Sequence, residues 1–243
     1  KEREAYLRAV RVIRQQIRGF KLLAGTGTPS LSETIELTKL AFELNYDGVV
    51  VLPPYYFRKV SDDGLFNWFS EVIDNAVPKD KYLLGYHIPP MTGIGFSLEL
   101  LERLKEKYPV QFAGIKDSSH DKDFATAVGQ KFGKDLLVLN GTDTYLHHAL
   151  QNNAQGAITA PANLISDNLR KIWDLYNEGK DPSEIQNKVN EQRHFLEKFS
   201  PVAPILKGLL HKIHGLPQWS VRSPLEDASQ TVIEEAMEEF LKI

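Results

Sequence analysis

The segment Phe112-Ala-Gly-Ile-Lys-Asp-Ser-Ser119 is apolar for most of its length and turns polar only near its end, and a helical pattern follows it. The same succession of a short strand-like run and an amphipathic helix occurs six times along the chain. Strands that alternate with helices predict βαβ units and a parallel sheet, and the lack of polar alternation is typical of strands covered on both faces. The other five runs cover residues 21–27, 48–56, 82–89, 136–143 and 156–163.

The number of strands allows two architectures. A closed (β/α)8 barrel needs eight strands, whereas an open doubly wound sheet can be built from six. We predict an α/β fold of the TIM-barrel type in which this chain supplies strands 3–8 and the first two strands lie ahead of residue 1. The helical pattern of residues 2–18, with Tyr6, Val10, Ile13 and Ile17 on one face, is then the second barrel helix.

The region after residue 163 contains helical patterns and no further strand pattern. The first pattern, near 165–178, completes the barrel. The remaining patterns, near 183–199, 202–214 and 226–242, predict a C-terminal helical extension. We therefore divide the chain into a barrel over residues 1–178 and an extension over residues 179–243.

The composition narrows the range of functions. The chain has 243 residues, a net charge of −3 and no cysteine, which argues against nucleic acid as a partner and excludes disulfides and thiolate chemistry. No apolar run is long enough to span a membrane, and we expect a cytoplasmic protein. His147 and His148 are adjacent and would diverge on a helix, so they do not predict a metal site, and we expect neither a metal nor an organic cofactor. Dinucleotide, phosphate-loop and nucleophile-elbow motifs are absent.

Lys116 stands near the end of the opening segment, at the carboxyl end of a predicted strand. Lysine is rarely buried, and an apolar strand is a costly place for an ammonium group. Such a site favours the neutral amine, which is the nucleophile that imine formation with a carbonyl requires. Barrel enzymes keep their active sites at this end of the strands. A structural lysine paired with Asp117 is the alternative interpretation.

The preceding strand ends in Gly85-Tyr-His-Ile-Pro-Pro-Met-Thr-Gly93. Tyr86 therefore lies near the carboxyl end of the strand next to that of Lys116. A phenol beside an imine can transfer protons to the carbinolamine hydroxyl and to the departing group. The alternative is a core tyrosine with a satisfied hydroxyl.

These two motifs together make the chain recognisable. The segment from Tyr86 to Gly93, followed by Gly114-Ile-Lys-Asp-Ser-Ser119, resembles the dihydrodipicolinate synthase and N-acetylneuraminate lyase family. Supporting segments in the family's order and spacing are Ala24-Gly-Thr-Gly27, Pro54-Tyr-Tyr56, Asn140-Gly-Thr-Asp143 and Gly156-Ala-Ile-Thr159.

The resemblance implies roles for particular residues. Lys116 would form the Schiff base with a 2-oxo acid, Tyr86 would relay protons, and Tyr56 would reach the active site of a neighbouring subunit in a homo-oligomer, a dimer or homotetramer. The remaining substrate-binding candidates come from the motif segments or from the polar stretch after the lysine; they are Thr92, Gly141, Ile158, Asp117 and Ser118.

Two departures from the family pattern affect the expected substrate. The family's Gly-Thr-Thr-Gly loop, which holds the carboxylate of the 2-oxo acid, should precede Lys1 and is not in this sequence. Met91 stands where the dihydrodipicolinate synthases have an arginine, and a thioether does not bind a carboxylate as a guanidinium does.

We therefore predict a class I aldolase that cleaves or forms a carbon–carbon bond between pyruvate, or another 2-oxo acid, and an aldehyde. Asp117 and Ser118 suit a hydroxylated substrate chain, so a dehydratase of 2-keto-3-deoxy sugar acids that uses the same imine remains open. A barrel that has lost activity and serves in binding or regulation is the alternative outside catalysis.

Overall fold

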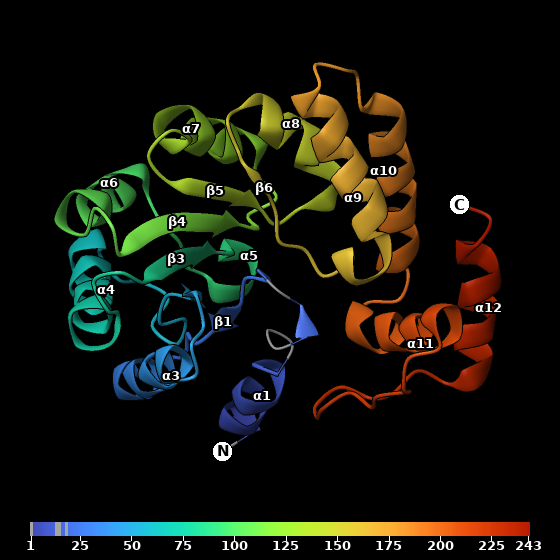
Figure 1. The fold of residues 1–243 in the computed structure, drawn as a ribbon, viewed down its shortest axis with the longest axis horizontal. Coiled ribbons are helices and arrows are strands. Elements are labelled where there is room, and N and C mark those ends of the chain that lie inside the picture. Colours follow the sequence, from blue (N-terminus) through green and yellow to red (C-terminus); the bar gives the residue numbers. More distant parts are fainter. Residues whose placement is uncertain (1, 13–15, 18) are drawn as a thin grey trace. The chain divides into compact units, whose positions relative to one another are not determined.

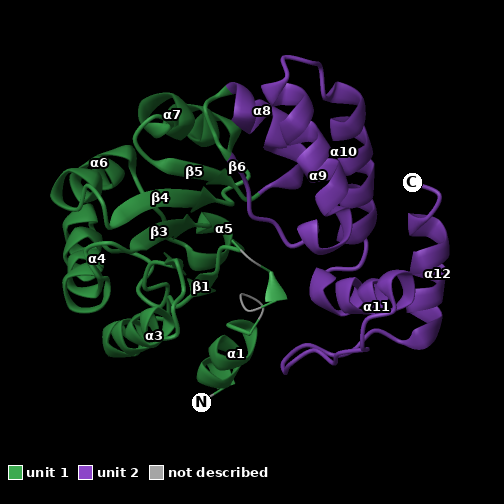
Figure 2. Ribbon diagram, in the orientation of Figure 1, with its two compact units in different colours: residues 1–141, 152–155 green, residues 142–151, 156–243 purple. Residues whose placement is uncertain are grey.

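The computed structural model describes residues 2–12, 16–17 and 19–243. The chain forms two compact units, which Figure 2 distinguishes by colour: residues 1–141 with 152–155, and residues 142–151 with 156–243. The predicted division after residue 178 stays a prediction.

The first unit is built around a parallel sheet. Its strands are β1 (Leu23–Gly25), β2 (Gly48–Val51), β3 (Tyr82–His87), β4 (Phe112–Asp117) and β5 (Leu137–Asn140). The sheet order follows the chain, β1-β2-β3-β4-β5-β6, where β6 is Gly156–Ala157, and the pairs from β1 to β5 are all parallel. Among the described residues, the helices of this unit are α1 (Glu2–Val10), α3 (Leu31–Glu43), α4 (Asp62–Ala76), α5 (Pro89–Thr92), α6 (Leu98–Lys107) and α7 (Lys122–Phe132).

Four helices, α3, α4, α6 and α7, lie along one side of the curled sheet (Figure 1). We call this side of the strands the helix-covered face. The strand residues on it, such as Val49, Leu83 and Ile115, are fully buried. Helices on a single face are typical of a barrel wall and not of a doubly wound sheet. The described residues hold six strands where a closed barrel has eight, and the two strands expected ahead of residue 1 stay a prediction.

The register between β3 and β4 contains an irregularity. Leu83 pairs with Phe112, whereas the next residue of β3, Leu84, pairs with Gly114. Ala113 is therefore an extra residue in β4, a β-bulge. From this point onward Gly85 pairs with Ile115 and Tyr86 with Lys116.

Side chains at the helix starts explain where several helices begin. Ser97 and Asp121 accept hydrogen bonds from backbone N–H groups in the first turns of α6 and α7. Ser30 caps α3 in the same way, by accepting from the N–H of Glu33 at 3.3 Å.

The second unit is mostly helical. It contains the short strand β6 (Gly156–Ala157), the 3-10 turn η1 (Asp143–Tyr145) and the helices α8 (Leu146–Gln151), α9 (Ala162–Asn177), α10 (Ser183–Glu197), α11 (Val202–His214) and α12 (Gln230–Phe240). The four helical patterns expected after residue 163 correspond to α9, α10, α11 and α12. Their apolar faces share one core that includes Ile172, Phe195 and Leu209.

The first helix differs from its prediction. α1 ends at Val10, and Leu7 is its buried residue, whereas Tyr6 is 63% exposed. The phenol of Tyr46 donates to the carbonyl of Leu7 at 3.0 Å, which fixes the rotation of the helix. The expected apolar position Ile13 lies outside the described residues.

Candidate active site

Lys116 and Tyr86 meet on the face of the sheet opposite to the helices, which we call the lysine face. They are register partners on the adjacent strands β3 and β4. The Nζ atom of Lys116 lies 3.9 Å from the centroid of the Tyr86 ring. Both side chains are half-buried. Each occupies the penultimate position of its strand, so both stand at the carboxyl end of the sheet, where barrel enzymes hold their reacting groups.

Asp117 faces the other side of β4, because successive strand residues point to opposite faces. It is 5% exposed, and its Oδ1 accepts from the N–H of Ser119 at 2.9 Å. Burial raises the pKa of Asp117 above its ordinary value, although the hydrogen bonds from Ser119 oppose this shift. Asp117 therefore lies on the helix-covered face of β4, and Lys116 lies on the lysine face.

Ser118 and Gly141 lie where the polypeptide leaves β4 and β5. The N–H of Ser118 donates to the carbonyl of His87 at 2.8 Å, and the N–H of Gly141 donates to the carbonyl of Asp117 at 2.6 Å. A Cβ atom at Gly141 would lie 1.9 Å from the Ser118 Oγ. Only glycine permits this close approach, so the two predicted residues lie together at the end of the β4 strand.

Thr92 and Tyr56 have very different surroundings. Thr92 is buried, and its hydroxyl contacts the carbonyls of Ile88 at 2.9 Å and Ile94 at 2.5 Å, so it holds the turn after α5. Tyr56 lies in the loop after β2 and is 76% exposed; its ring packs edge-on against Phe57. The structure thus gives Thr92 a local structural role and leaves Tyr56 at the surface of the first unit.

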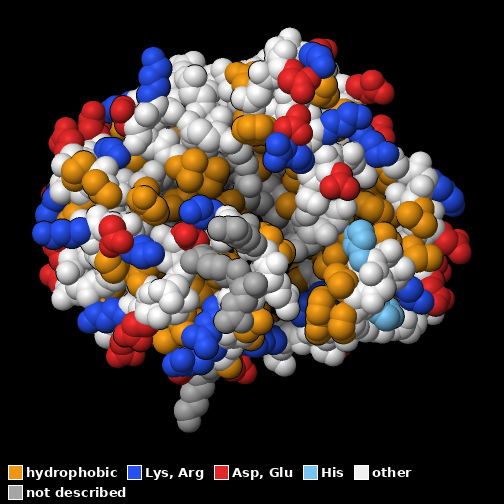
Figure 3. Space-filling model, viewed as in Figure 1, with side chains coloured by type: hydrophobic (Ala, Val, Ile, Leu, Met, Phe, Trp, Pro, Cys, Tyr) orange, Lys and Arg blue, Asp and Glu red, His pale blue; other side chains and the backbone are white. Residues whose placement is uncertain are grey.

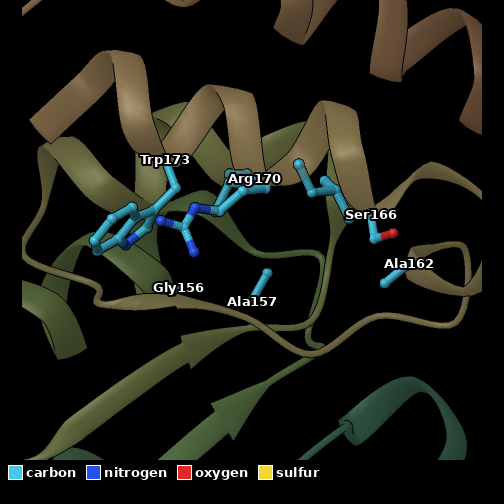
Figure 4. A pocket seen from close by; sticks show the side chains of 8 residues that line it. Gly156, Ala157, Ala162, Ser166, Arg170 and Trp173 are labelled. Atoms are coloured by element: carbon cyan, nitrogen blue, oxygen red, sulfur yellow. The ribbon is translucent and has the colours of Figure 1, made fainter. Parts of the chain in front are cut away.

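Ile158 belongs to the second unit, directly after β6, and is half-buried. The backbone before it borders a cavity of about 230 Å³ between β6, α8 and α9 (Figure 4). Arg170 is the one charged side chain among its described lining residues; it bonds to Asp174 at 2.8 Å and lies over the ring of Trp173. The cavity therefore offers mainly apolar walls and no general base.

His87 is a buried polar residue of the site region to which the sequence analysis gave no role. It is the last residue of β3 and lies on the helix-covered face, 5% exposed. Burial lowers the pKa of His87 to about 4, although the charge of Asp121 raises it. The strand alternation around Tyr86 was the available signal, since it places the next residue on the opposite face.

Charged groups of both signs are interspersed over the face of the molecule in Figure 3. Within the described part of the chain, no three His, Asp or Glu side chains come together as a metal site would need. The described helices include none that is long and apolar enough to cross a membrane.

A model of the dihydrodipicolinate synthetase family matches residues 2–242 of the chain. Two named relatives represent different reactions. A 4-hydroxy-tetrahydrodipicolinate synthase of Prochlorococcus marinus is 34% identical over 227 residues, which cover 92% of this chain and 71% of that protein. An N-acetylneuraminate lyase of Rattus norvegicus is 29% identical over 208 residues, 84% of this chain and 64% of that protein.

A solved structure shares the fold. It is a prophage protein of the dihydrodipicolinic acid synthase family from E. coli K12, determined in complex with pyruvate. The TM-score is 0.89 at 23% identity, and the match covers 99% of this chain and 80% of that one.

Proposed function

The chain belongs to the dihydrodipicolinate synthetase family, whose named members are lyases of the class I aldolase type, and we propose that it joins pyruvate to an aldehyde, or reverses this reaction, through an imine on Lys116. The observation that carries the proposal is the contact between the Lys116 Nζ and the Tyr86 ring at the carboxyl ends of β3 and β4. The prophage protein's pyruvate complex supports the choice of a 2-oxo acid.

The chemistry begins with the neutral amine of Lys116. Its lone pair attacks the C2 carbonyl and forms a carbinolamine, which loses water to give a protonated imine. This cation accepts the electron pair of the C3–C4 bond when that bond breaks, while the C4 hydroxyl gives its proton to Tyr86 acting as the base, and an enamine and an aldehyde result. In the synthetic direction C3 loses a proton to form the enamine, which then attacks the aldehyde. Tyr86 transfers the protons to and from the carbinolamine oxygen.

The substrate aldehyde is expected to differ from that of the dihydrodipicolinate synthases. Met91 in α5 is 75% exposed and carries no charge with which to hold a second carboxylate. We therefore expect aspartate semialdehyde to be a poor partner and a hydroxylated aldehyde to be a better one. Analysis of the products distinguishes this aldol reaction from loss of water by a keto-deoxy sugar acid.

Reduction with borohydride in the presence of pyruvate tests the proposal directly. The reductant converts the imine into a stable amine, and we expect the added mass on the peptide that contains Lys116. A Lys131→Ala variant is a suitable control, because Lys131 lies on α7 and pairs with Glu102 at 2.9 Å. Labelling of another lysine, or of none, would contradict the assignment.

A further inference from the structure

We infer that His87 is a positioning residue, which ties the segment returning from α5 to the end of β3 and so holds Tyr86 beside Lys116. The inference rests on the function proposed above. His87 does not face the reacting groups, because it lies on the helix-covered face of β3 while Tyr86 lies on the lysine face. Its effect must pass through the backbone that the two neighbouring residues share.

The ring of His87 is held on two sides. Its Nδ1 accepts a hydrogen bond from the N–H of Phe96 at 2.8 Å. The face of the imidazole contacts Phe124 of α7, whose ring stacks on it at a centroid distance of 4.1 Å with an interplanar angle of 13°. Since Nδ1 accepts, the neutral ring carries its proton on Nε2. His87 therefore joins β3, the α5–α6 connection and α7.

The connection between α5 and α6 is fitted closely around this ring. A Cβ atom at Gly95 would lie 2.5 Å from the Cε1 of His87, and one at Gly85 would lie 2.6 Å from the ring of Phe96. Phe96 is 2% exposed and packs at 5.0 Å from Phe69. Two glycines thus allow the segment to lie directly on the strand, and the histidine supplies its polar attachment.

The backbone of His87 also joins the two strands of the site. Its carbonyl accepts from the N–H of Ser118 at 2.8 Å, just beyond Lys116. The charge that acts on the ring is that of Asp121, which caps α7, and Asp117 is the register partner of His87 on β4. Because burial keeps the pKa of His87 near 4, the ring stays neutral and Nδ1 stays an acceptor at neutral pH. The attachment is therefore present under ordinary assay conditions.

Two substitutions separate the hydrogen bond from the packing. His87→Asn keeps an acceptor oxygen at the same number of bonds from Cα as Nδ1, whereas His87→Leu keeps apolar volume and loses the acceptor. We expect His87→Leu to lower the rate of pyruvate C3 proton exchange by about tenfold or more, because small displacements of catalytic groups are costly. KM for pyruvate should change little, and His87→Asn should recover most of the rate. Val72→Ala on α4, a buried position away from the site, controls for lost stability.

Hydrogen exchange of the Phe96 amide measures whether its hydrogen bond to His87 is intact, independently of catalysis. It should accelerate in His87→Leu and stay protected in His87→Asn. Unchanged protection in His87→Leu, an equal loss of rate in the Leu and Asn variants, or an equal loss in Val72→Ala would overturn the inference. If the wild-type protein forms no borohydride-stable adduct, the proposed function is wrong, and amide exchange alone then decides whether His87 holds this segment.

Discussion

The two faces of the β3–β4 pair carry different kinds of polar side chain, only one residue apart. On the lysine face, Tyr86 and Lys116 are half-buried and contact each other. On the helix-covered face, His87 and Asp117 are also register partners, but each is 5% exposed and bonded to a backbone N–H group. A histidine and an aspartate look more catalytic than a lysine and a tyrosine, yet here each of them accepts a hydrogen bond from the backbone. Exposure, not residue type, separates the pair that we propose to react from the pair that is bonded to the backbone.

Removing the amine from the lysine face should have the largest effect. Lys116→Ala cannot form an imine, so we expect carbon–carbon lyase activity to fall by roughly 10³-fold or more, in the range seen when a nucleophile is removed. Pyruvate with borohydride should add no mass to this variant. Its unfolding free energy should remain close to that of the wild-type protein, because the side chain is only half-buried. Retained labelling would show that another lysine forms the imine.

Removing only the hydroxyl from the same face tests proton transfer. Tyr86→Phe keeps the ring against Lys116, so the imine should still be trapped by borohydride. Turnover should fall by about 10²–10⁴-fold, the usual contribution of a general acid or base. Comparing the trapped adduct with steady-state kcat separates the two steps. Equal kcat in the variant and the wild type would remove Tyr86 from the mechanism.

Lowering the pH should destabilise the protein through protonation of His87 on the helix-covered face. The pKa of His87 falls from 6.5 to about 4 on folding, so its contribution to stability is present above pH 6.5 and is lost as the pH falls through about 4. The gap corresponds to about 3 kcal/mol of unfolding free energy. Denaturant titrations between pH 7 and pH 4 should show this loss in the wild type and a smaller one in His87→Asn. Asp117, whose raised pKa acts in the opposite sense, is common to both proteins. Parallel curves would contradict the prediction.

The smallest effect on activity is expected from a substitution in α5, outside the β3–β4 pair. Met91→Arg should improve condensation of pyruvate with aspartate semialdehyde by only about twofold to fivefold, since an exposed ion pair contributes under about 1 kcal/mol. The pyruvate adduct on Lys116 should form as in the wild type. Saturable, efficient use of aspartate semialdehyde by the unaltered protein would show that the position of Met91 does not determine the choice of aldehyde.

Much of the architecture could be predicted from the sequence, because the strand runs and the helical patterns have different periods. All six strands and the four helices after residue 163 are where the patterns indicate, although the observed strands are shorter. The adjacency of Tyr86 and Lys116 also followed from chain order in a parallel sheet. These features depend on local pattern and on simple topology.

Other features depend on contacts that a linear pattern does not contain. The pattern favoured Tyr6 as a core residue of α1, but the bond from Tyr46 to the Leu7 carbonyl sets a different rotation. The contacts of the Thr92 hydroxyl with the carbonyls of Ile88 and Ile94 were not foreseen, and substrate binding by Thr92 stays a prediction. The role of His87 required the position of the Phe96 amide, nine residues away.

The bulge at Ala113 determines which face of β4 Lys116 occupies, because successive strand residues point to opposite faces. Phe112 and Leu83 both point toward the helices, and if Ala113 paired with Leu84 as in a regular strand, every later side chain of β4 would change sides. Ile115 would then stand beside Tyr86, and the lysine would be directed into the helix layer. One additional residue between the bulge and Lys116 would therefore exchange an amine for an isoleucine beside Tyr86 while leaving the composition of the strand almost unaltered, so length variation here is a far stricter constraint than substitution.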